Sequence, residues 1–140
     1  MVRIDVVYEG DLHTRCCHRP SGRALETDAP KDNEGRGESF SPTDLLATAL
    51  GSCILTVMGI LARRHGWPLA GARASVQKHM NSQPPRRVQR LVVRLEMPPG
   101  IPAAARAPLE RAARGCPVGE SLHPEVQVDL EFAWPPADPA

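Results

Sequence analysis

The sequence predicts an α+β fold built around one long helix. Three observations support this class: alternating apolar residues predict strands near both ends of the chain, an apolar run between Ser41 and Gly66 predicts the helix, and two alternating segments after it predict a hairpin. At 140 residues, 41% of them hydrophobic, the chain is long enough for one domain with a buried core.

Short strands are predicted before the helix. Apolar residues at Val2, Ile4, Val6 and Tyr8 alternate with other side chains, so we expect an opening strand with one buried face. Residues 29–40 are charged and glycine-rich, which predicts a mobile surface loop of the kind that often carries function. The predicted strands cover residues 2–8, 12–18 and 24–27.

The long helix has clear start and stop signals. Ser41 can cap it, Pro42 suits its first position, Asp44 favours its first turn and Gly66 ends it. Because apolar residues cover the helix nearly all round, we expect the rest of the fold or a second subunit to enclose it. One apolar stripe is predicted at Leu46, Leu50, Cys53, Val57 and Leu61.

After the helix, residues 70–77 and 91–97 both alternate, which predicts an antiparallel hairpin. A short helix is expected at 108–114 and a last strand at 126–132. We therefore expect a single domain over residues 1–135 and a disordered tail over 136–140, where prolines dominate.

Bulk properties exclude several functions. A formal net charge of +1 favours neither nucleic acid nor an anionic membrane as partner. The charged amino terminus is unlike a secretory signal, and we expect no apolar stretch that approaches the roughly 20 residues needed to cross a bilayer. We therefore expect a cytoplasmic protein, in which the 4 cysteines are reactive or buried thiols rather than a disulfide framework.

Cys53 and Cys116 are the candidate reactive thiols. Gly51 and Ser52 are small neighbours that could leave room beside the Cys53 sulfur, and Cys116 precedes Pro117 at the start of a short helix, where backbone N–H groups favour a thiolate. Cys53 lies beyond the first helical turn, so its thiolate would need a cation from elsewhere in the fold. The alternative is that both are inert small apolar residues.

The run Cys16-Cys17-His18, with His13 nearby, invites a zinc interpretation. Adjacent residues on a strand point to opposite faces, and the chain has no Cys-x-x-Cys pair. We therefore expect no metal site and no cofactor, with one of these two cysteines buried and the other exposed.

Two motifs carry a resemblance to a known family. The run from Ser41 to Cys53 (SPTDLLATALGSC) resembles the central-helix signature of the OsmC/Ohr family of thiol peroxidases, and Gly115-Cys116-Pro117-Val118 resembles its second-cysteine motif. The order of elements also matches, so the resemblance spans roughly Val2 to Trp134. It implies an intertwined homodimer with antiparallel sheets around long central helices and active sites at the subunit interface.

The resemblance also implies a reaction. Cys53 would attack an organic hydroperoxide, Cys116 would capture the resulting sulfenic acid as a disulfide, and a lipoyl-type or other dithiol would restore both thiols. Two alternatives stay open: a non-catalytic dimer that binds a small apolar ligand at its interface, and a purely structural thiol pair.

The sequence departs from the family pattern at one position. Organic-hydroperoxide members carry a glutamate ten residues before the first cysteine, paired with an arginine that stabilises the thiolate; here that position is Thr43, with Asp44 next to it. Asp44 lies about 13 Å from Cys53 along the helix and half a turn round, so it would join a Cys53 site more easily from the other subunit. Arg15 is our candidate arginine; its competitors are Arg19, Arg23 and Arg36.

Overall fold

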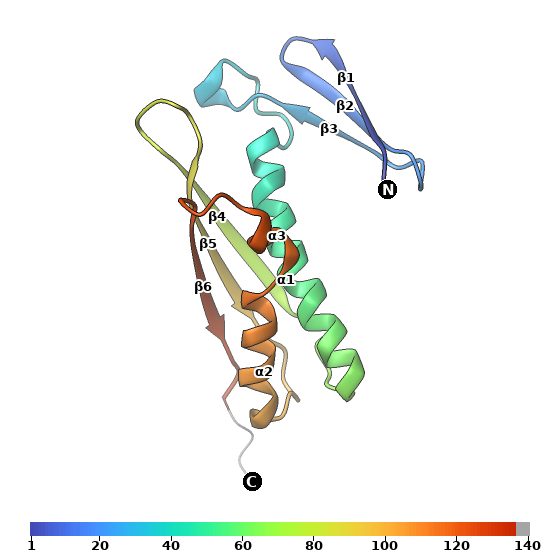
Figure 1. Cartoon of the computed structure of the whole chain (residues 1–140), viewed down its shortest axis with the longest axis vertical. Helices are drawn as coiled ribbons and strands as arrows, with labels where there is room; N and C mark the ends of the chain where they lie inside the picture. Colours follow the sequence, from blue (N-terminus) through green and yellow to red (C-terminus); the bar gives the residue numbers. More distant parts are fainter. Residues whose placement is uncertain (137–140) are drawn as a thin grey trace. The chain divides into compact units, whose positions relative to one another are not determined.

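A computed structural model describes residues 1–136, so of the predicted tail, residues 137–140 lie outside the described residues. The chain divides into two compact units, Met1–Leu46 and a second that begins at Ala47. Each unit contains one sheet of three strands (Figure 1).

The first unit is an antiparallel meander. Its strands β1 (Ile4–Gly10), β2 (His13–His18) and β3 (Ala24–Asp28) follow one another in space as they do in the sequence, which confirms the three predicted strands. A short 3-10 helix, η1 (Lys31–Asn33), follows β3.

The prediction that one face of β1 is buried is wrong for this chain. Ile4, Val6 and Tyr8 are between 59% and 64% exposed, and Val7 on the opposite face is 60% exposed. The alternation is present, but the first unit contains no second layer on which this sheet could pack. Apolar residues that alternate along a strand show which face could be buried, and they do not show that the same chain buries it.

The glycine-rich loop after β3 folds back on itself. Gly35 and Gly37 donate backbone hydrogen bonds to the carbonyls of Pro30 and Ala29, at 3.0 and 3.2 Å. A Cβ on Gly35 would lie 1.7 Å from the Ala29 carbonyl oxygen, so this close approach requires glycine. The loop thereby returns the chain to the end of β3, where the Asp28 N–H bonds to the Phe40 carbonyl at 3.0 Å.

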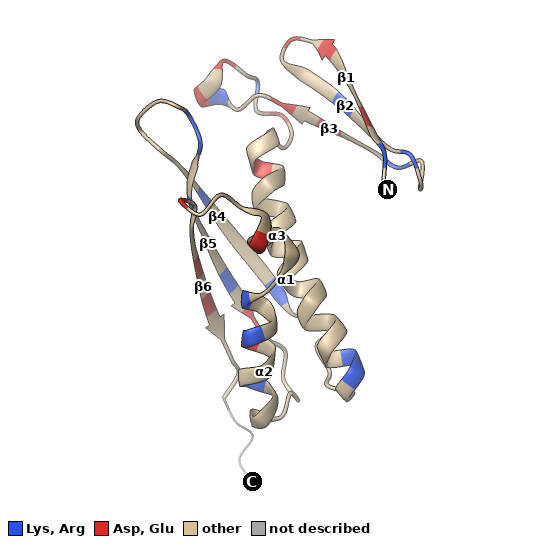
Figure 2. Cartoon of the chain, viewed as in Figure 1, with Lys and Arg blue, Asp and Glu red and all other residues tan. Residues whose placement is uncertain are grey.

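Helix α1 (Pro42–His65) starts and ends as predicted. Ser41 and Asp44 form a reciprocal cap: the Asp44 N–H donates to Ser41 Oγ at 3.1 Å, and the Ser41 N–H donates to Asp44 Oδ2 at 2.9 Å. Figure 2 shows an acidic residue near the start of the helix and basic residues at its end, the distribution that suits the helix dipole.

The apolar stripe predicted on α1 does not coincide with the face of the helix that is buried. Of its members only Leu50 is buried, whereas Cys53 is half-buried. The cause is a close approach to strand β4 (Arg73–Met80), where a Cβ on Gly51 would lie 2.8 Å from Val76 Cγ2. Small residues therefore define the buried face as much as large ones do. This face consists of Ala47, Leu50, Gly51, Ile54, Met58 and Ala62.

The expectation that no apolar stretch approaches membrane-spanning length is also wrong. Helix α1 has 24 residues and a mean hydropathy of 2.2 over its most apolar window, so its length and composition would allow a span. The core helix of a soluble protein has the same properties, and the packing of Gly51 against Val76 and Ala74 of β4 accounts for part of the apolar surface of α1.

The second sheet is mixed rather than antiparallel. Strands β4 and β5 (Val88–Glu96) form the predicted antiparallel hairpin, but β6 (Gln127–Ala133) pairs with β5 in parallel. Parallel neighbours need a long crossover connection, and the chain between β5 and β6 supplies it with helices α2 (Ala103–Arg114) and α3 (Pro117–Ser121). The prediction of antiparallel sheets overlooked this strand–helix–strand unit.

Helix α2 begins five residues earlier than predicted, and Pro108 lies inside it. Proline is costly in a helix interior. The alanine-rich first turns favour helix, and Ala105, Leu109 and Ala113 are buried along one face, which offsets that cost. The core of the second unit also contains Leu91, Val93 and Leu95 of β5, each 0% exposed.

Candidate thiol site

The second unit brings Cys53 and Cys116 together. Cys116 lies in the crossover between α2 and α3, at the N-cap of α3, and is 2% exposed. Cys53 projects from α1, is half-buried, and lies close enough to Cys116 to raise the pKa of that thiol. Both are free cysteines. Residues 63 positions apart in the sequence are thus adjacent in the fold.

Gly119 completes the site. Its backbone N–H donates to Cys116 Sγ at 3.2 Å, which is the capping bond of α3. A Cβ at position 119 would lie 3.3 Å from that sulfur and 3.7 Å from Leu50 Cδ1. Glycine at this position therefore lets the α3 backbone approach both the sulfur and helix α1.

The prediction that backbone N–H groups favour a thiolate at Cys116 is correct about the donor and wrong about the direction of the pKa. Burial raises the pKa of Cys116 above its ordinary value, and this effect exceeds the lowering by the Gly119 N–H; the neighbouring Cys53 thiol raises it further. The backbone donor that the sequence predicted is present, but the burial that accompanies it was not taken into account. The raised pKa favours the protonated form of Cys116, and a thiol is a nucleophile only when its proton is removed.

The small residues before Cys53 do not have the role that the sequence suggested. Gly51 faces Val76 and Ala74 of β4, so it allows helix–sheet packing and not access to the sulfur. Ser52 is exposed, and its carbonyl accepts a hydrogen bond from Thr56 Oγ1 at 2.8 Å.

The two residues proposed to stabilise a thiolate both belong to the first unit. Arg15 is exposed on β2, between Val7 of β1 and Glu26 of β3, and no ion pair holds its guanidinium within residues 1–136. Asp44 takes part in the reciprocal cap with Ser41 at the start of α1.

The expected contrast between Cys16 and Cys17 is wrong, because both are half-buried. The histidines near them have other partners: His18 Nδ1 lies 2.6 Å from Ser21 Oγ, and His13 Nδ1 lies 2.6 Å from Asp28 Oδ1. Nothing in the described chain gathers the two sulfurs and His18 around a common point.

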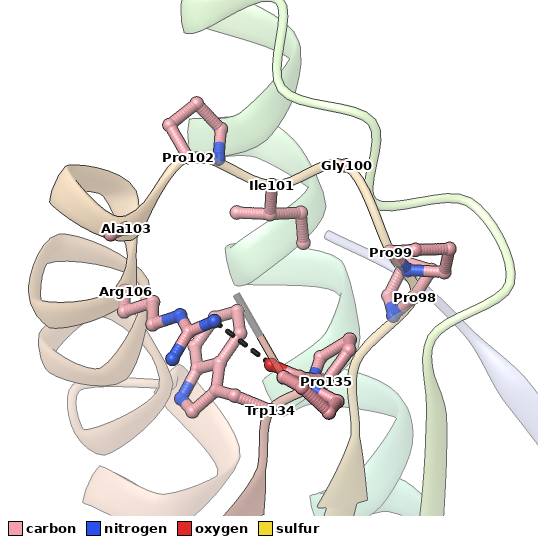
Figure 3. A pocket seen from close by; sticks show the side chains of 10 residues that line it. Pro98, Pro99, Gly100, Ile101, Pro102, Ala103, Arg106, Trp134 and Pro135 are labelled. Atoms are coloured by element: carbon pink, nitrogen blue, oxygen red, sulfur yellow. Dashed lines mark hydrogen bonds between the residues drawn. The ribbon is translucent and has the colours of Figure 1, made fainter. Parts of the chain in front are cut away.

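The second unit has two hollows whose lining residues include neither Cys53 nor Cys116. One, of 510 Å³, is bounded by Leu55, Gly59 and Arg63 of α1 and by residues 67–72. The other, of 260 Å³, lies between residues 98–103 and Trp134 (Figure 3). In it the Arg106 guanidinium lies over the Trp134 ring at 5.2 Å and donates to the Pro135 carbonyl at 3.0 Å.

The fold is α+β, and its paired thiols are Cys53 on the long helix and Cys116 in the crossover between two parallel strands. The chain belongs to the OsmC family, because residues 35–131 match the model described as OsmC-like protein. No curated protein matches the sequence.

Solved structures agree with this assignment. A protein from Psychrobacter arcticus 273-4, named for an osmotic stress induced and detoxification response, is 40% identical, with a TM-score of 0.89 over 95% of this chain and 96% of that one. An organic hydroperoxide resistance protein OsmC from Legionella pneumophila is 14% identical, with a TM-score of 0.76 over 95% and 96% of the two chains. One from Elizabethkingia anophelis is 12% identical, with a TM-score of 0.76 and 96% of each chain covered. The two distant structures share the fold.

Proposed function

We propose that this protein is a thiol-dependent peroxidase that reduces organic hydroperoxides in the cytoplasm. The observation that carries the proposal is the proximity of the Cys53 and Cys116 thiols, in a fold shared with proteins named for organic hydroperoxide resistance. A pair of thiols that can reach each other can close a disulfide without a large rearrangement of the chain.

In the first step the Cys53 thiolate attacks the terminal oxygen of the hydroperoxide. The O–O bond breaks, the alkoxide leaves and takes a proton to become the alcohol, and Cys53 becomes a sulfenic acid. Cys53 is half-buried on a helix whose buried residues are all apolar, which suits an organic peroxide better than hydrogen peroxide.

In the second step the Cys116 sulfur attacks the sulfur of the Cys53 sulfenic acid. Hydroxide leaves and takes up the proton lost from Cys116, so the products are water and the Cys53–Cys116 disulfide. A lipoyl-type or other dithiol then reduces this disulfide by exchange and is itself oxidised to a disulfide. Over the cycle, one hydroperoxide and one dithiol give one alcohol, one water and one oxidised dithiol.

We further propose that the working form is a homodimer. Ile4, Val6 and Tyr8 of β1 leave an apolar strand face exposed in the single chain, and such faces mark interaction surfaces. A second copy would also bring an Arg15, with Asp44 as its carboxylate partner, from outside the chain that carries Cys53, which is how we propose that the thiolate is stabilised.

Peroxide consumption with a lipoyl dithiol tests the proposal in the wild type, Cys53→Ser, Cys116→Ser and the matched control Cys17→Ser. We expect turnover in the wild type and in Cys17→Ser, and none in Cys53→Ser. In Cys116→Ser the sulfenic acid should persist long enough to be trapped by a dione reagent. Full turnover in Cys53→Ser would refute the assignment of Cys53.

A second candidate is a non-catalytic protein that binds a small apolar ligand. The 510 Å³ hollow beside α1, with the Trp67 ring stacked on His65 at 4.4 Å, favours it, and so does Thr43 at the position of the family's glutamate. This function predicts no peroxide turnover in the wild type with any dithiol, together with saturable binding of an apolar probe that Trp67→Ala abolishes.

A further inference from the structure

A cluster of one histidine and two glutamates lies in the first unit, away from the thiols in the sequence. His13 Nε2, one carboxylate oxygen of Glu9 and one of Glu26 all lie within 4.8 Å of one another. From these residues we propose a binding site for a divalent transition-metal ion of the zinc type, ligated by His13, Glu9 and Glu26.

The strand register explains why these residues meet. His13 lies directly opposite Asp28 on β3, and Glu26 is two residues before Asp28, so Glu26 is on the same face of the sheet. Glu9 lies on β1, the other neighbour of β2 in the sheet. The pairing of β1 with β2 is irregular between Tyr8 and Gly10, which leaves Glu9 without a partner in the register. Bulges of this kind redirect a side chain.

The distances around His13 Nε2 leave room for a shared ion. Nε2 of His13 lies 3.4 Å from Glu26 Oε1 and 3.6 Å from Glu9 Oε1. Hydrogen bonds from nitrogen to oxygen are usually about 2.7–3.2 Å long, so the contact with Glu26 is a long hydrogen bond and the contact with Glu9 exceeds that range. Two donor atoms that each lie about 2.1 Å from a tetrahedral zinc ion are about 3.4 Å apart.

Asp28 fixes the orientation of the His13 ring. Its side chain is 8% exposed, and Oδ1 lies 2.6 Å from His13 Nδ1. With the ring neutral, that hydrogen bond keeps the proton on Nδ1 and leaves the Nε2 lone pair directed at the two glutamates. A carboxylate behind a ligating imidazole is the usual outer partner in zinc sites. Asp28 Oδ2 in turn accepts the Glu38 N–H at 3.1 Å, so Asp28 is a positioning residue.

The surroundings favour a cation. A hollow of 250 Å³ beside the cluster is lined by Glu9, Asp11, His13, Asp28 and Glu38, with Arg36 as its one basic member besides the histidine. Arg36 lies 3.8 Å from Asp11. The hollow has room for water to complete the coordination of the ion. One imidazole and two carboxylates suit zinc or a similar ion more than calcium or magnesium, which take mostly oxygen ligands.

The test is titration of the reduced, metal-free full chain with zinc chloride, followed by calorimetry. We expect one equivalent to bind to the wild type and this binding to weaken at least tenfold in Glu9→Gln/Glu26→Gln and in His13→Gln. Because Glu9 and Glu26 are 44% and 52% exposed, the glutamine variants should keep the fold, which circular dichroism verifies. Asp28→Asn should weaken binding by about 10- to 100-fold.

Two matched variants separate this site from other zinc ligands. His18→Gln, on the same strand, should bind zinc as the wild type does, and so should Cys53→Ser/Cys116→Ser. The inference is overturned if the wild type binds no zinc, if Glu9→Gln/Glu26→Gln binds it unchanged, or if the bound equivalent is lost only in the cysteine variant. Because it involves none of the thiols, the result is independent of peroxidase activity.

Discussion

The two sheets of this protein have the same number of strands but are stabilised in different ways. The β4–β5–β6 sheet has a core of its own, in which Leu91, Val93 and Leu95 are fully buried. The β1–β2–β3 sheet exposes most of its apolar side chains, and its buried residues include the polar Thr27 and Asp28. The difference indicates that the second unit supplies stability and the thiol pair, whereas the first leaves apolar surface exposed.

The same substitution made in each unit should give the largest difference between them. Leu50 is 1% exposed and Leu25 is 47% exposed. Leu50→Ala should lower the free energy of unfolding by about 3–5 kcal/mol, because it removes buried contacts and leaves a cavity. Leu25→Ala should cost less than about 1 kcal/mol in denaturant unfolding at low protein concentration.

A cost for Leu25→Ala that grows with protein concentration would show that a second copy covers the first sheet. Equal costs for Leu50→Ala and Leu25→Ala at every concentration would contradict the difference between the two units.

Two glycines of α1 provide a smaller, matched test. A Cβ on Gly51 would lie 2.8 Å from Val76 Cγ2, whereas a Cβ on Gly59 would meet no atom within 4 Å. Gly51→Ala should destabilise the protein by about 1 kcal/mol, since overpacking outweighs the gain in helix propensity. Gly59→Ala should stabilise it by up to about 1 kcal/mol. Thermal unfolding of both variants checks the order, and the reverse order would mean that α1 does not pack on β4 as described.

The start of α1 gives an effect of similar size. Ser41→Ala removes the acceptor of the Asp44 N–H and should cost about 1 kcal/mol in the free energy of unfolding. Ser52→Ala, at an exposed position of the same helix, is the control and should change stability little. If urea unfolding shows no difference between the two, the cap is not stabilising.

The smallest effect is a dependence on pH. The hydrogen bond from Arg90, followed by that from Gln127, lowers the pKa of Asp129 on β6. Its stabilisation is therefore present above the pKa of an unfolded aspartate, about 3.9, and is lost as the pH falls through the lower folded value. Asp129→Asn should unfold more easily than the wild type at neutral pH, and the difference should vanish in acid.

Asp5 on β1 is the counterpart in the first unit, because bonds from Arg3 and then Arg19 lower its pKa. Asp5→Asn should show the same sign of pH dependence. A difference between Asp129→Asn and the wild type that grows in acid would contradict the assignment.

The sequence predicted elements well where the pattern is local. The cap at Ser41 and Asp44, the end of α1 and the β4–β5 hairpin all follow from neighbouring residues and are confirmed. The proximity of Cys53 to Cys116 could not be read from spacing, and it was the family resemblance that implied it. The parallel pairing of β6 was predictable in principle, because the connection before it contains helices.

Burial was predicted less well, because it depends on what packs against each element. Val6 alternates as a buried residue would and is 60% exposed, while Gly51 lies on the buried face because β4 approaches it closely. The direction of the pKa of Cys116 was missed for the same reason. Glu9 and Glu26 carried no sequence signal as a pair, since a bulge and a cross-strand register bring them to His13.

The central claim is that Cys53 and Cys116 act as one redox pair, and intact-protein mass spectrometry with peptide mapping tests it most directly. After one equivalent of an organic hydroperoxide, the wild type should lose the mass of two hydrogen atoms and yield a peptide that joins Cys53 to Cys116. A wild-type chain in which both sulfurs stay reduced, or in which Cys53 gains oxygen atoms while Cys116 remains a free thiol, would contradict the account.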